Sequence, residues 1–303
     1  MSLLKKKEKK QANEKFSIEP FLYLTPFLIG VCVFTLYPVI NVFVISFQEN
    51  YNMMKSTYTG FGLDNFVKVF SDADFMNALK NTSLYVLFVV PISTCLSLFV
   101  ANLLNKKLRF SALFQTAFFL PMVTSVTAIG LAWKWMYNYD YGVINYFLSI
   151  FGISSINWLN DVNFALPALI IYGIWSIMPF TIILFLSGLQ NINEQYYTAA
   201  KVDGASSSRI FFKITVPLLA PTTGLILIVN TISTSKVFNE LFPLFSGKPG
   251  PAYSLYTVVY YIYDAFQLDW QLGKASAAAV ILFLIVFVFT MLQLWIQRKW
   301  KHY

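Results

Sequence analysis

The stretch Glu194–Pro217 reads EQYYTAAKVDGASSSRIFFKITVP and is a polar loop between two long apolar runs. The pair Ala199–Ala200 favours a helix, and Asp203–Gly204 favours a turn, because glycine adopts a positive φ at little cost. Apolar residues then recur every three or four positions, which predicts a second helix. Pro217 opens the next apolar run, where the missing N–H of a proline costs little. The loop is therefore predicted to be a helix–turn–helix that lies against a membrane and offers apolar side chains to another protein.

The overall composition indicates that lipid is the solvent for much of the chain. Of 303 residues, 57% are hydrophobic and 12% are charged, which is about half the charged share of a soluble domain. The net charge of +8 does not indicate nucleic acid as a partner, because the basic residues lie at the borders of apolar runs. Cys32 and Cys95 lie inside apolar runs and are interpreted as small buried hydrophobic residues rather than a disulfide or metal pair. The one histidine of the sequence, His302, leaves no histidine-based metal site to expect.

Six apolar runs are each long enough to cross the hydrocarbon core of a bilayer, which takes about 20 helical residues. Backbone groups in lipid must pair within the protein, so we expect helices, interrupted in places by proline. The predicted fold class is an all-α membrane protein with six transmembrane helices, at Phe21–Phe47, Asn81–Leu104, Phe110–Tyr137, Leu166–Leu189, Pro217–Phe245 and Ala275–Ile296. The cluster of Trp133, Trp135 and Tyr137 is interpreted as an aromatic belt at the membrane interface.

The distribution of basic residues orients these spans. If the six spans are threaded in order, fifteen of the 22 lysines and arginines, including every arginine, lie on the side of the Glu194–Pro217 loop. The positive-inside rule makes that side cytoplasmic, together with both termini of a multi-pass protein of the plasma membrane. We predict a basic cytoplasmic tail at 1–20, the first span with an extracellular segment at 21–76, a core domain at 77–297 with a cytoplasmic loop at 190–217, and a basic cytoplasmic end at 298–303.

Several ordered motifs resemble one family of membrane proteins. AAKVDGA at Ala199–Ala205, followed by Ile214 and Pro217, resembles the EAA loop of ABC-importer permeases. The resemblance is to the binding-protein-dependent sugar permeases related to the maltose and glycerol-3-phosphate systems, and it extends from about Phe61 to about Ile296. It is also carried by FFLPMV (118–123), NYDYGVINYFL (138–148), INWLND (156–161) and GLQNI (188–192).

The resemblance implies a type I ABC-importer permease fold and a chain that is not itself an enzyme. The sequence has no GxxxxGK[ST] phosphate loop, so ATP and Mg²⁺ are expected on two partner ATPase subunits, with no cofactor in this chain. The loop would sit in a cleft of the ATPase, whose closure on ATP would make a central cavity alternate between outside and inside. The implied coupling residues are Glu194, Ala199, Ala200, Asp203, Gly204, Ala205, Phe212, Ile214 and Pro217.

One position departs from the family. Thr198 stands where the EAA motif carries its usual glutamate, and Glu194 lies one helical turn earlier. A salt bridge from that glutamate to the ATPase is therefore not carried over. The other partners that the resemblance implies are a second homologous permease, an extracellular solute-binding protein and a carbohydrate, in addition to the lipid bilayer.

Two polar faces are candidates for the substrate path. In the fifth span, Asn230, Ser233 and Thr234 share a face at helical spacing, and the resemblance favours them as sugar contacts. Lys236 and Glu240, four residues apart, are read either as a structural ion pair or as cavity groups. The fourth span adds Ser176 and Phe180 beside a proline. The predicted substrate path is Ser176, Phe180, Asn230, Ser233, Thr234 and Lys236.

Three other functions would each leave a different mark on the sequence. A permease for glycerol-3-phosphate or another acidic sugar-like solute would give Lys236 a charge to bind. A stand-alone secondary transporter would show inverted repeats with broken helices in both halves, which the sequence does not display. A membrane enzyme would need clustered His, Asp or Glu near one membrane face, and the sequence has no such cluster.

Overall fold

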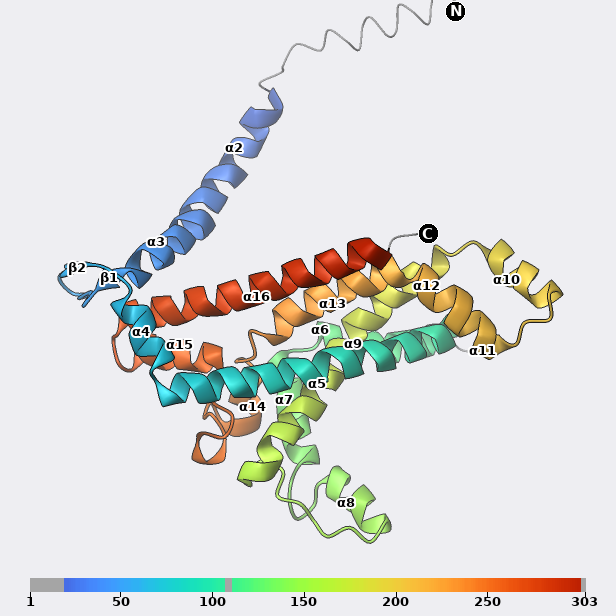
Figure 1. Ribbon diagram of the computed structural model, residues 1–303. Coiled ribbons are helices and arrows are strands. Elements are labelled where there is room, and N and C mark those ends of the chain that lie inside the picture. Colours follow the sequence, from blue (N-terminus) through green and yellow to red (C-terminus); the bar gives the residue numbers. More distant parts are fainter. Residues whose placement is uncertain (1–18, 107–110, 301–303) are drawn as a thin grey trace, which may run out of the picture.

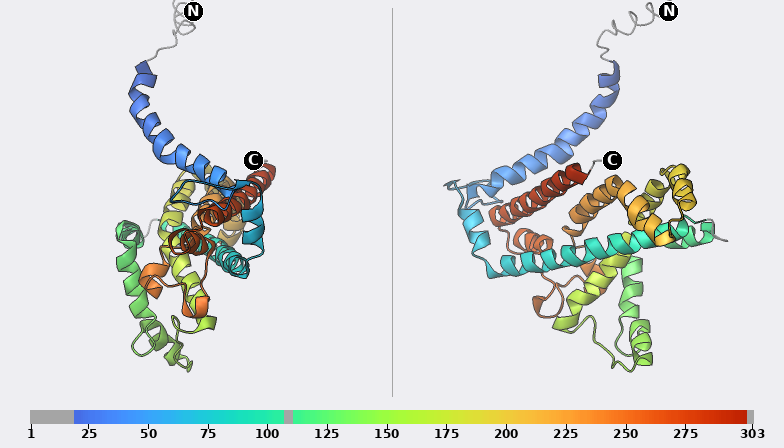
Figure 2. Two further views of the ribbon diagram at one scale, coloured as in Figure 1. Left: turned by 90° about the vertical axis from the view of Figure 1, so that its left-hand side faces the viewer. Right: turned by 45° about the vertical axis from the view of Figure 1, so that its right-hand side comes forward.

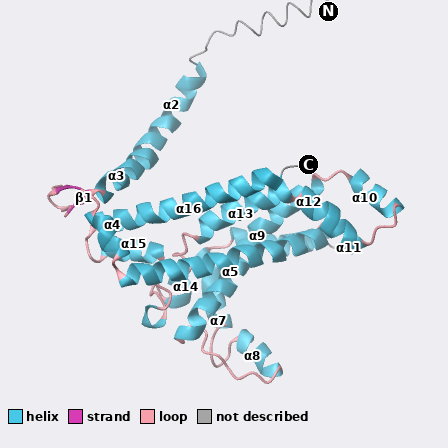
Figure 3. Cartoon of the chain, viewed as in Figure 1, coloured by secondary structure: helices cyan, strands magenta, loops and turns pink. Residues whose placement is uncertain are grey.

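The structure is a computed structural model that describes residues 19–106 and 111–300, and helices make up most of it (Figures 1 and 3). The predicted basic tail lies outside the described residues except for Glu19 and Pro20. Lys107, Arg109 and residues 301–303 of the predicted basic end also lie outside them.

Short turns and one small ribbon connect the helices. In chain order the elements are α2 (Glu19–Val31), the π-helix η1 (Cys32–Leu36), α3 (Tyr37–Ser46), β1 (Gln48–Glu49), β2 (Gly60–Phe61), α4 (Asp64–Phe70), α5 (Ala73–Leu104), α6 (Ser111–Val123), α7 (Val126–Met136), α8 (Val143–Ile150), α9 (Val162–Gln190), α10 (Glu194–Val202), α11 (Ser207–Ile210), the π-helix η2 (Phe211–Thr215), α12 (Val216–Leu218), α13 (Ala220–Thr234), α14 (Leu241–Phe245), the 3₁₀-helix η3 (Pro251–Tyr253), α15 (Val258–Gln267) and α16 (Leu272–Trp300). The strands β1 and β2 pair antiparallel, with Gln48 opposite Phe61.

Four continuous helices of the described chain are long and apolar enough to cross a membrane, and two bent pairs bring the number to six. The continuous spans are Leu22–Ser46, Ala73–Leu104, Val162–Gln190 and Leu272–Lys299. The first agrees with the predicted span to within one residue at each end. The other three extend further than predicted, because polar residues continue the helices beyond the apolar runs. Asp72, for example, caps α5 by accepting a hydrogen bond from Asp74 N. The segment before α5 is correspondingly shorter than expected.

The other two predicted spans are not straight. In the third, α6 and α7 meet at 106°, and the break follows Pro121 at Thr124 and Ser125. In the fifth, the helical segment Ser207–Leu218 meets α13 at 65°, between Pro217 and Pro221. Proline removes a backbone donor and sterically opposes the preceding turn, which accounts for a bend at each place.

The body is held together along α5 and α9, which pack closely over much of their length. Gly173 on α9 makes this approach possible, because a Cβ at that position would overlap the ring of Tyr85 on α5. The large core cluster on this side includes Tyr85, Tyr172 and Leu244. By contrast, α2, η1 and α3 form one helix of which α3 packs against α16, with the ring of Phe43 5.7 Å from that of Phe283, while α2 projects away from the body (Figures 1 and 2).

Two sequence interpretations of side-chain environment were wrong. Trp133 and Tyr137 do not form an interfacial belt, since they are 8% and 2% exposed in the core, and the Tyr137 hydroxyl donates to the Ala168 carbonyl at 2.8 Å. Only Trp135 of that cluster points outward. Cys32 and Cys95 are free thiols, but both are exposed rather than buried, as expected for side chains on the outside of membrane helices.

Candidate functional site

The loop Glu194–Pro217 forms the predicted helix–turn–helix at one end of the bundle, close to the C-terminal end of α16 (Figure 1). Its first helix, α10, begins at the N-cap Asn193, whose side chain accepts a hydrogen bond from Gln195 N at 2.9 Å. The side of α10 that faces the body carries Tyr197 and the buried Ala200. The Thr215 hydroxyl donates to the Tyr197 hydroxyl at 3.4 Å. One side of α10 is thus fixed to the second half of the loop.

The opposite side of α10 is an apolar surface without a partner in the described chain. Tyr196 and Val202 are 56% and 83% exposed, and Ala199 lies between them, also exposed. The spacing of three residues places the three side chains on one helix face. We call Tyr196, Ala199 and Val202 the α10 face.

The turn after α10 is a Schellman motif. Gly204 has a φ of +73°, the Ala205 N–H donates to the Ala200 carbonyl at 2.9 Å, and the Gly204 N–H donates to the Lys201 carbonyl at 3.1 Å. These two bonds satisfy carbonyls that the end of a helix leaves unpaired. Asp203 ends the helix just before the glycine, with an exposed side chain. The predicted turn at Asp203–Gly204 is confirmed, and the positive φ explains why a glycine stands there.

A polar groove of about 490 Å³ lies beside the loop and involves the position that departs from the EAA motif. Glu194, Thr198 and Lys201 line it from α10, and Lys106 lines it from the end of α5. The Thr198 hydroxyl donates to the Glu194 carbonyl at 3.2 Å, back onto its own helix. Glu194 and Thr198 therefore belong to the groove side of α10 and not to the α10 face.

The second half of the loop continues into the bundle. Ile214 is half-buried, Pro217 is exposed, and Phe212 is 67% exposed with its ring 5.1 Å from that of Phe211. Leu219 then enters a core cluster shared with Phe185 of α9. The loop is thus attached to the body through both of the helices that flank it.

The predicted path residues are separated into two groups. Asn230 and Thr234 are each 3% exposed. Asn230 donates from Nδ2 to Thr181 Oγ1 on α9 at 3.1 Å, and Thr234 donates from Oγ1 to the Asn230 carbonyl at 2.7 Å. Both side chains are therefore used within this chain, and neither reaches an open surface of it.

Ser176, Phe180, Ser233 and Lys236 form the second group, and all four are exposed, Phe180 at 38%. The helix α13 ends at Thr234, so Lys236 and Glu240 do not share a helix face. The Glu240 carboxylate instead accepts a hydrogen bond from Phe238 N at 3.1 Å. Among the described residues the ion pairs are Lys68–Asp64 and Lys274–Asp72, so a structural Lys236–Glu240 pair is not formed.

Asn145 is a structural centre that the sequence reasoning missed. Its side chain is 4% exposed, donates to the carbonyls of Asn138, Tyr139 and Ile156, and accepts from Ile156 N and Trp158 Nε1. These bonds join the motifs at 138–148 and 156–161, for which the sequence alone indicates no structural role. The spacing of polar residues does not reveal such a contact, because the partners are mostly backbone carbonyls.

At the other end of the bundle, a charged cluster joins α5, α15 and α16. Lys274 Nζ lies 2.7 Å from Asp72 Oδ2, and the Tyr261 hydroxyl donates to the same oxygen at 2.8 Å. Burial raises the pKa of Asp72, but the hydrogen bonds from Lys274 and Tyr261 outweigh it, so that the pKa is lowered overall. Among the described residues, no group of three or more His, Cys, Asp or Glu side chains is placed to hold a metal ion.

Comparison with known proteins identifies relatives over nearly the whole chain. Residues 93–302 match the family described as binding-protein-dependent transport system inner membrane component. The chain is 34% identical over 290 residues to the lactose transport system permease protein LacF of Rhizobium radiobacter, covering 94% of this chain and 96% of LacF. It is 32% identical over 287 residues to the arabinooligosaccharides transport system permease protein AraP of Halalkalibacterium halodurans, covering 94% of this chain and 89% of AraP.

A solved structure shares the fold. A chain of a bacterial alginate ABC transporter, crystallised in complex with an alginate pentasaccharide-bound periplasmic protein, superimposes with a TM-score of 0.74 at 24% identity. The likeness covers 92% of this chain and 93% of that chain. The two chains therefore share their overall arrangement of helices.

Proposed function

Because the chain belongs to the family of binding-protein-dependent transport system inner membrane components, we propose that it is one permease subunit of an ATP-driven importer for a carbohydrate. A second, homologous permease completes the path, two ATPase subunits hold ATP and Mg²⁺, and an extracellular solute-binding protein delivers the carbohydrate. The relatives support this substrate class, since two are named for lactose and arabinooligosaccharides and the solved neighbour carries alginate.

The observation that carries the proposal is the α10 face. Tyr196, Ala199 and Val202 are exposed on a short helix whose other side is packed and whose end is closed by a Schellman turn. A fixed apolar helix face needs no ordering before it enters a groove of a partner, which favours binding. The partner we propose is the ATPase subunit, and the side of the membrane is the cytoplasm.

The same geometry supports transmission of movement from the ATPase to the spans. Gly188 of α9 lies against Leu219 and Thr222, so that the end of α9 and the start of α13 are in direct contact. Phe185 and Leu219 lie in one buried cluster. A displacement of α10 therefore moves α9 and α13 together, and these helices carry the predicted path residues.

Thr198 changes the expected docking chemistry. A threonine cannot form the salt bridge that the usual glutamate of the EAA motif provides, and this Thr198 hydroxyl bonds to its own helix. Glu194 is exposed on the groove side, beside Lys201. We therefore propose that docking depends mainly on the apolar contacts of the α10 face, with Glu194 as a weaker polar contact at its edge.

The exposed residues Ser176, Phe180, Ser233 and Lys236 are the part of the predicted path that remains available to a substrate or to the second permease. Hydroxyls and an aromatic ring suit the polar edges and the C–H face of a sugar. Lys236 has no carboxylate partner among the described residues, which favours an acidic sugar or a sugar phosphate as the alternative substrate. The projecting helix Leu22–Ser46 offers lipid or the second permease a further apolar surface.

Cysteine labelling tests the orientation in this proposal, and an uptake assay tests its ATP dependence. In a chain with Cys32 and Cys95 replaced by alanine, Val202→Cys and Met54→Cys each place one thiol on an exposed position at opposite ends of the bundle. A membrane-impermeant maleimide added outside intact cells is expected to label Met54→Cys only. Labelling of Val202→Cys from outside, or uptake of a sugar by this chain without nucleotide hydrolysis, contradicts the proposal.

A further inference from the structure

The strands β1 and β2, the helix α4 and the start of α16 lie at the end of the bundle opposite α10 (Figure 1). A hollow of about 550 Å³ lies between the residues of this region. Its walls are the loop between β1 and β2, the helix α4, and the segment that begins α16. We call it the hairpin hollow. None of the predicted path residues and none of the predicted coupling residues lines it, whereas Lys274 of the Asp72 cluster does.

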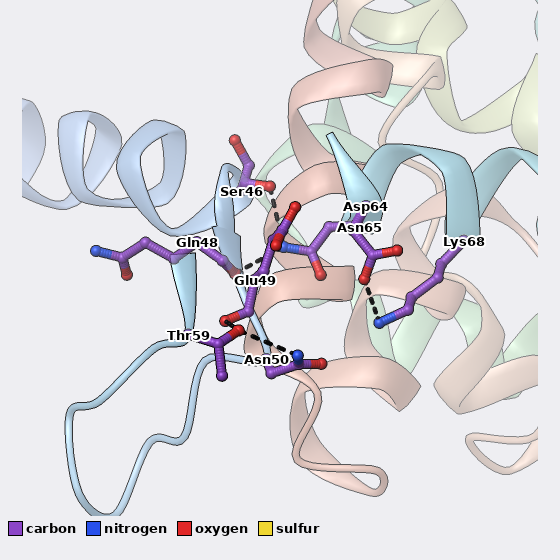
Figure 4. A network of polar contacts seen from close by, with 8 residues as sticks. All are labelled: Ser46, Gln48, Glu49, Asn50, Thr59, Asp64, Asn65 and Lys68. Atoms are coloured by element: carbon purple, nitrogen blue, oxygen red, sulfur yellow. Dashed lines mark hydrogen bonds and ion pairs between the residues drawn. The ribbon is translucent and has the colours of Figure 1, made fainter. Parts of the chain in front are cut away.

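One residue that lines the hollow, Asn65, has an almost fully buried side-chain amide that is fixed by hydrogen bonds to the backbone. Asn65 is 5% exposed, and its Nδ2 donates to the carbonyls of Ser46 at 3.1 Å and Gln48 at 2.9 Å. Gly273 leaves room for this amide, because a Cβ there would overlap it. The Asn65 Oδ1 has no hydrogen-bond partner within residues 19–106 and 111–300 and belongs to the lining (Figure 4). The two hydrogen bonds from Nδ2 fix the orientation of the Asn65 amide, and its Oδ1 remains able to accept a hydrogen bond from a ligand.

Two further side-chain amides, in the loop between β1 and β2, are also hydrogen-bonded at one end and unpaired at the other. Asn50 donates from Nδ2 to Thr59 Oγ1 at 3.1 Å, which leaves its Oδ1 unpaired in the described chain. Asn52 accepts at Oδ1 from Met54 N and Lys55 N, which leaves its Nδ2 unpaired there. The hollow is thus lined by preorganised acceptors and a donor whose other ends are anchored.

The remaining wall supplies an aromatic ring and more donors. Trp270 is 57% exposed, and Gln271 follows it with no side-chain partner among the described residues. Lys68 and Lys274 line the hollow, and each is held by one carboxylate, Asp64 and Asp72 respectively. An ammonium has three N–H donors, so one ion pair leaves others available. In Figure 4, Lys68, Asn65 and Asn50 lie around one space.

We propose that the hairpin hollow binds one or two sugar units of a saccharide. Vicinal hydroxyls both donate and accept, which matches fixed amides of both polarities, and the Trp270 ring offers a flat apolar surface for the C–H face of a pyranose. Binding of a saccharide in the hollow does not depend on the proposed function. Only the role of this subsite, to hold the saccharide at the outer end of the transport path, rests on that function.

Saturation-transfer NMR on the full chain in lipid nanodiscs tests the subsite, with maltotriose and trigalacturonate as probes. We expect saturation transfer to at least one trisaccharide, and binding about tenfold weaker in Trp270→Gly and in Gln271→Ala, which corresponds to the loss of one good contact. Neither side chain has a hydrogen-bond, ion-pair or ring partner among the described residues. Trp270 also has a φ of +57°, which glycine adopts readily, so Trp270→Gly is not expected to disturb the fold.

Tyr253→Gly is the matched control, because Tyr253 is also an exposed aromatic residue with a positive φ of +59° but does not line the hollow. Binding of both probes should be unchanged in it. The inference is overturned if neither probe receives saturation, or if Trp270→Gly and Gln271→Ala bind like the parent. It is also overturned if those variants bind sugar normally and lose only stimulation by a solute-binding protein, since the hollow is then a protein-docking surface.

ATP-driven uptake by the complete complex separates this inference from the proposed function. Sugar binding that requires Trp270, in a complex that shows no ATP-driven uptake of any sugar, supports the subsite and contradicts the proposed function. ATP-driven sugar uptake by a chain in which Trp270→Gly changes no binding contradicts the subsite alone.

Discussion

The side chain of Asn230 on α13 donates from Nδ2 to Thr181 Oγ1 on α9 at 3.1 Å, and both residues are buried. The Thr181 hydroxyl in turn donates to the Ile177 carbonyl at 3.1 Å. A hydrogen bond between membrane helices contributes about 0.6 kcal/mol on average and up to about 2 kcal/mol. The bond joins the two helices that flank the α10 loop, so it fixes the unit that the loop is proposed to move.

Asn230→Ala is therefore expected to destabilise the protein by about 1 kcal/mol, because it removes the bond and leaves a small cavity. Ser233→Ala, one turn away on the exposed side of α13, is expected to leave stability unchanged and to weaken sugar-stimulated ATP hydrolysis in the complex. Thermal unfolding of the purified variants checks the effect on stability, and ATPase titrations with sugar check the effect on stimulated hydrolysis. Unchanged unfolding of Asn230→Ala with a raised half-saturating sugar concentration would make Asn230 a substrate contact instead.

The sequence predicted this polar segment but not which side of it faces the protein. Asn230, Ser233 and Thr234 have spacings of three and four residues, and helical periodicity groups them equally well with a cavity or with a neighbouring helix. Burial by α9 decides between these, and Thr181 of α9, the partner of Asn230, lies 49 positions away in the sequence. The prediction that Lys236 shares a helix with Glu240 was wrong for a different reason. The helix α13 ends at Thr234, and no proline or glycine marks that end in the sequence.

Gly204→Val is expected to uncouple ATP hydrolysis from sugar while the protein still inserts in the membrane. A β-branched residue at a φ of +73° is strained by about 1–2 kcal/mol, and the Schellman bonds from Gly204 and Ala205 would be lost or distorted. Gly204→Asn is the control, because asparagine tolerates the left-handed conformation. The measurement is the ratio of sugar-stimulated to basal hydrolysis in the reconstituted complex. Equal stimulation in the valine and asparagine variants would remove the coupling role of the turn.

The helix–turn–helix could be predicted from the sequence because its determinants are local. An alanine pair and an Asp-Gly turn act within a few residues of where they stand, and the structure has both features where they were expected. The prediction that Pro217 opens the fifth span was wrong, because Pro217 lies at the end of the helical segment Ser207–Leu218 and α13 begins after the bend, at Ala220. The 106° bend between α6 and α7 could not be predicted in the same way. Pro121 marks a possible break, but the direction of the chain after it depends on packing such as that of Gly130 against Pro243.

Asn145→Ala is expected to lower the free energy of unfolding by about 2–3 kcal/mol, since it leaves buried backbone groups and the Trp158 indole N–H without partners. Asn160→Ala is the matched control, because Asn160 is exposed and only bonds to Asn157 Oδ1; it should stay within about 0.5 kcal/mol of the parent. Thermal or denaturant unfolding in detergent gives both values. Similar stability of the two variants would show that solvent replaces the partners of Asn145.

The last prediction concerns Asp264 of α15, which lies outside the membrane-spanning segments. The Tyr256 hydroxyl donates to its Oδ2 at 2.8 Å, while Oδ1 is buried without a partner in the described chain. Burial raises the pKa of Asp264, and nearby Asp269 raises it further, although the bond from Tyr256 lowers it in part. The folded protein thus holds the proton of this carboxyl more tightly than the unfolded chain does.

It follows that the charged form of Asp264 costs stability, and that this cost appears as pH rises from the ordinary aspartate value of 3.8 through the raised pKa. Asp264→Asn removes the charge and keeps an acceptor for Tyr256, so it should raise the unfolding temperature at pH 7. The gain over the parent should shrink as the pH is lowered toward 3.8. Asp140→Asn is the control, because Asp140 is an exposed carboxyl on the loop before α8. It should change neither the unfolding temperature at pH 7 nor the dependence of that temperature on pH. A variant Asp264→Asn that is less stable than the parent at pH 7, with no dependence of the difference on pH, would mean that the carboxylate is compensated by the fold.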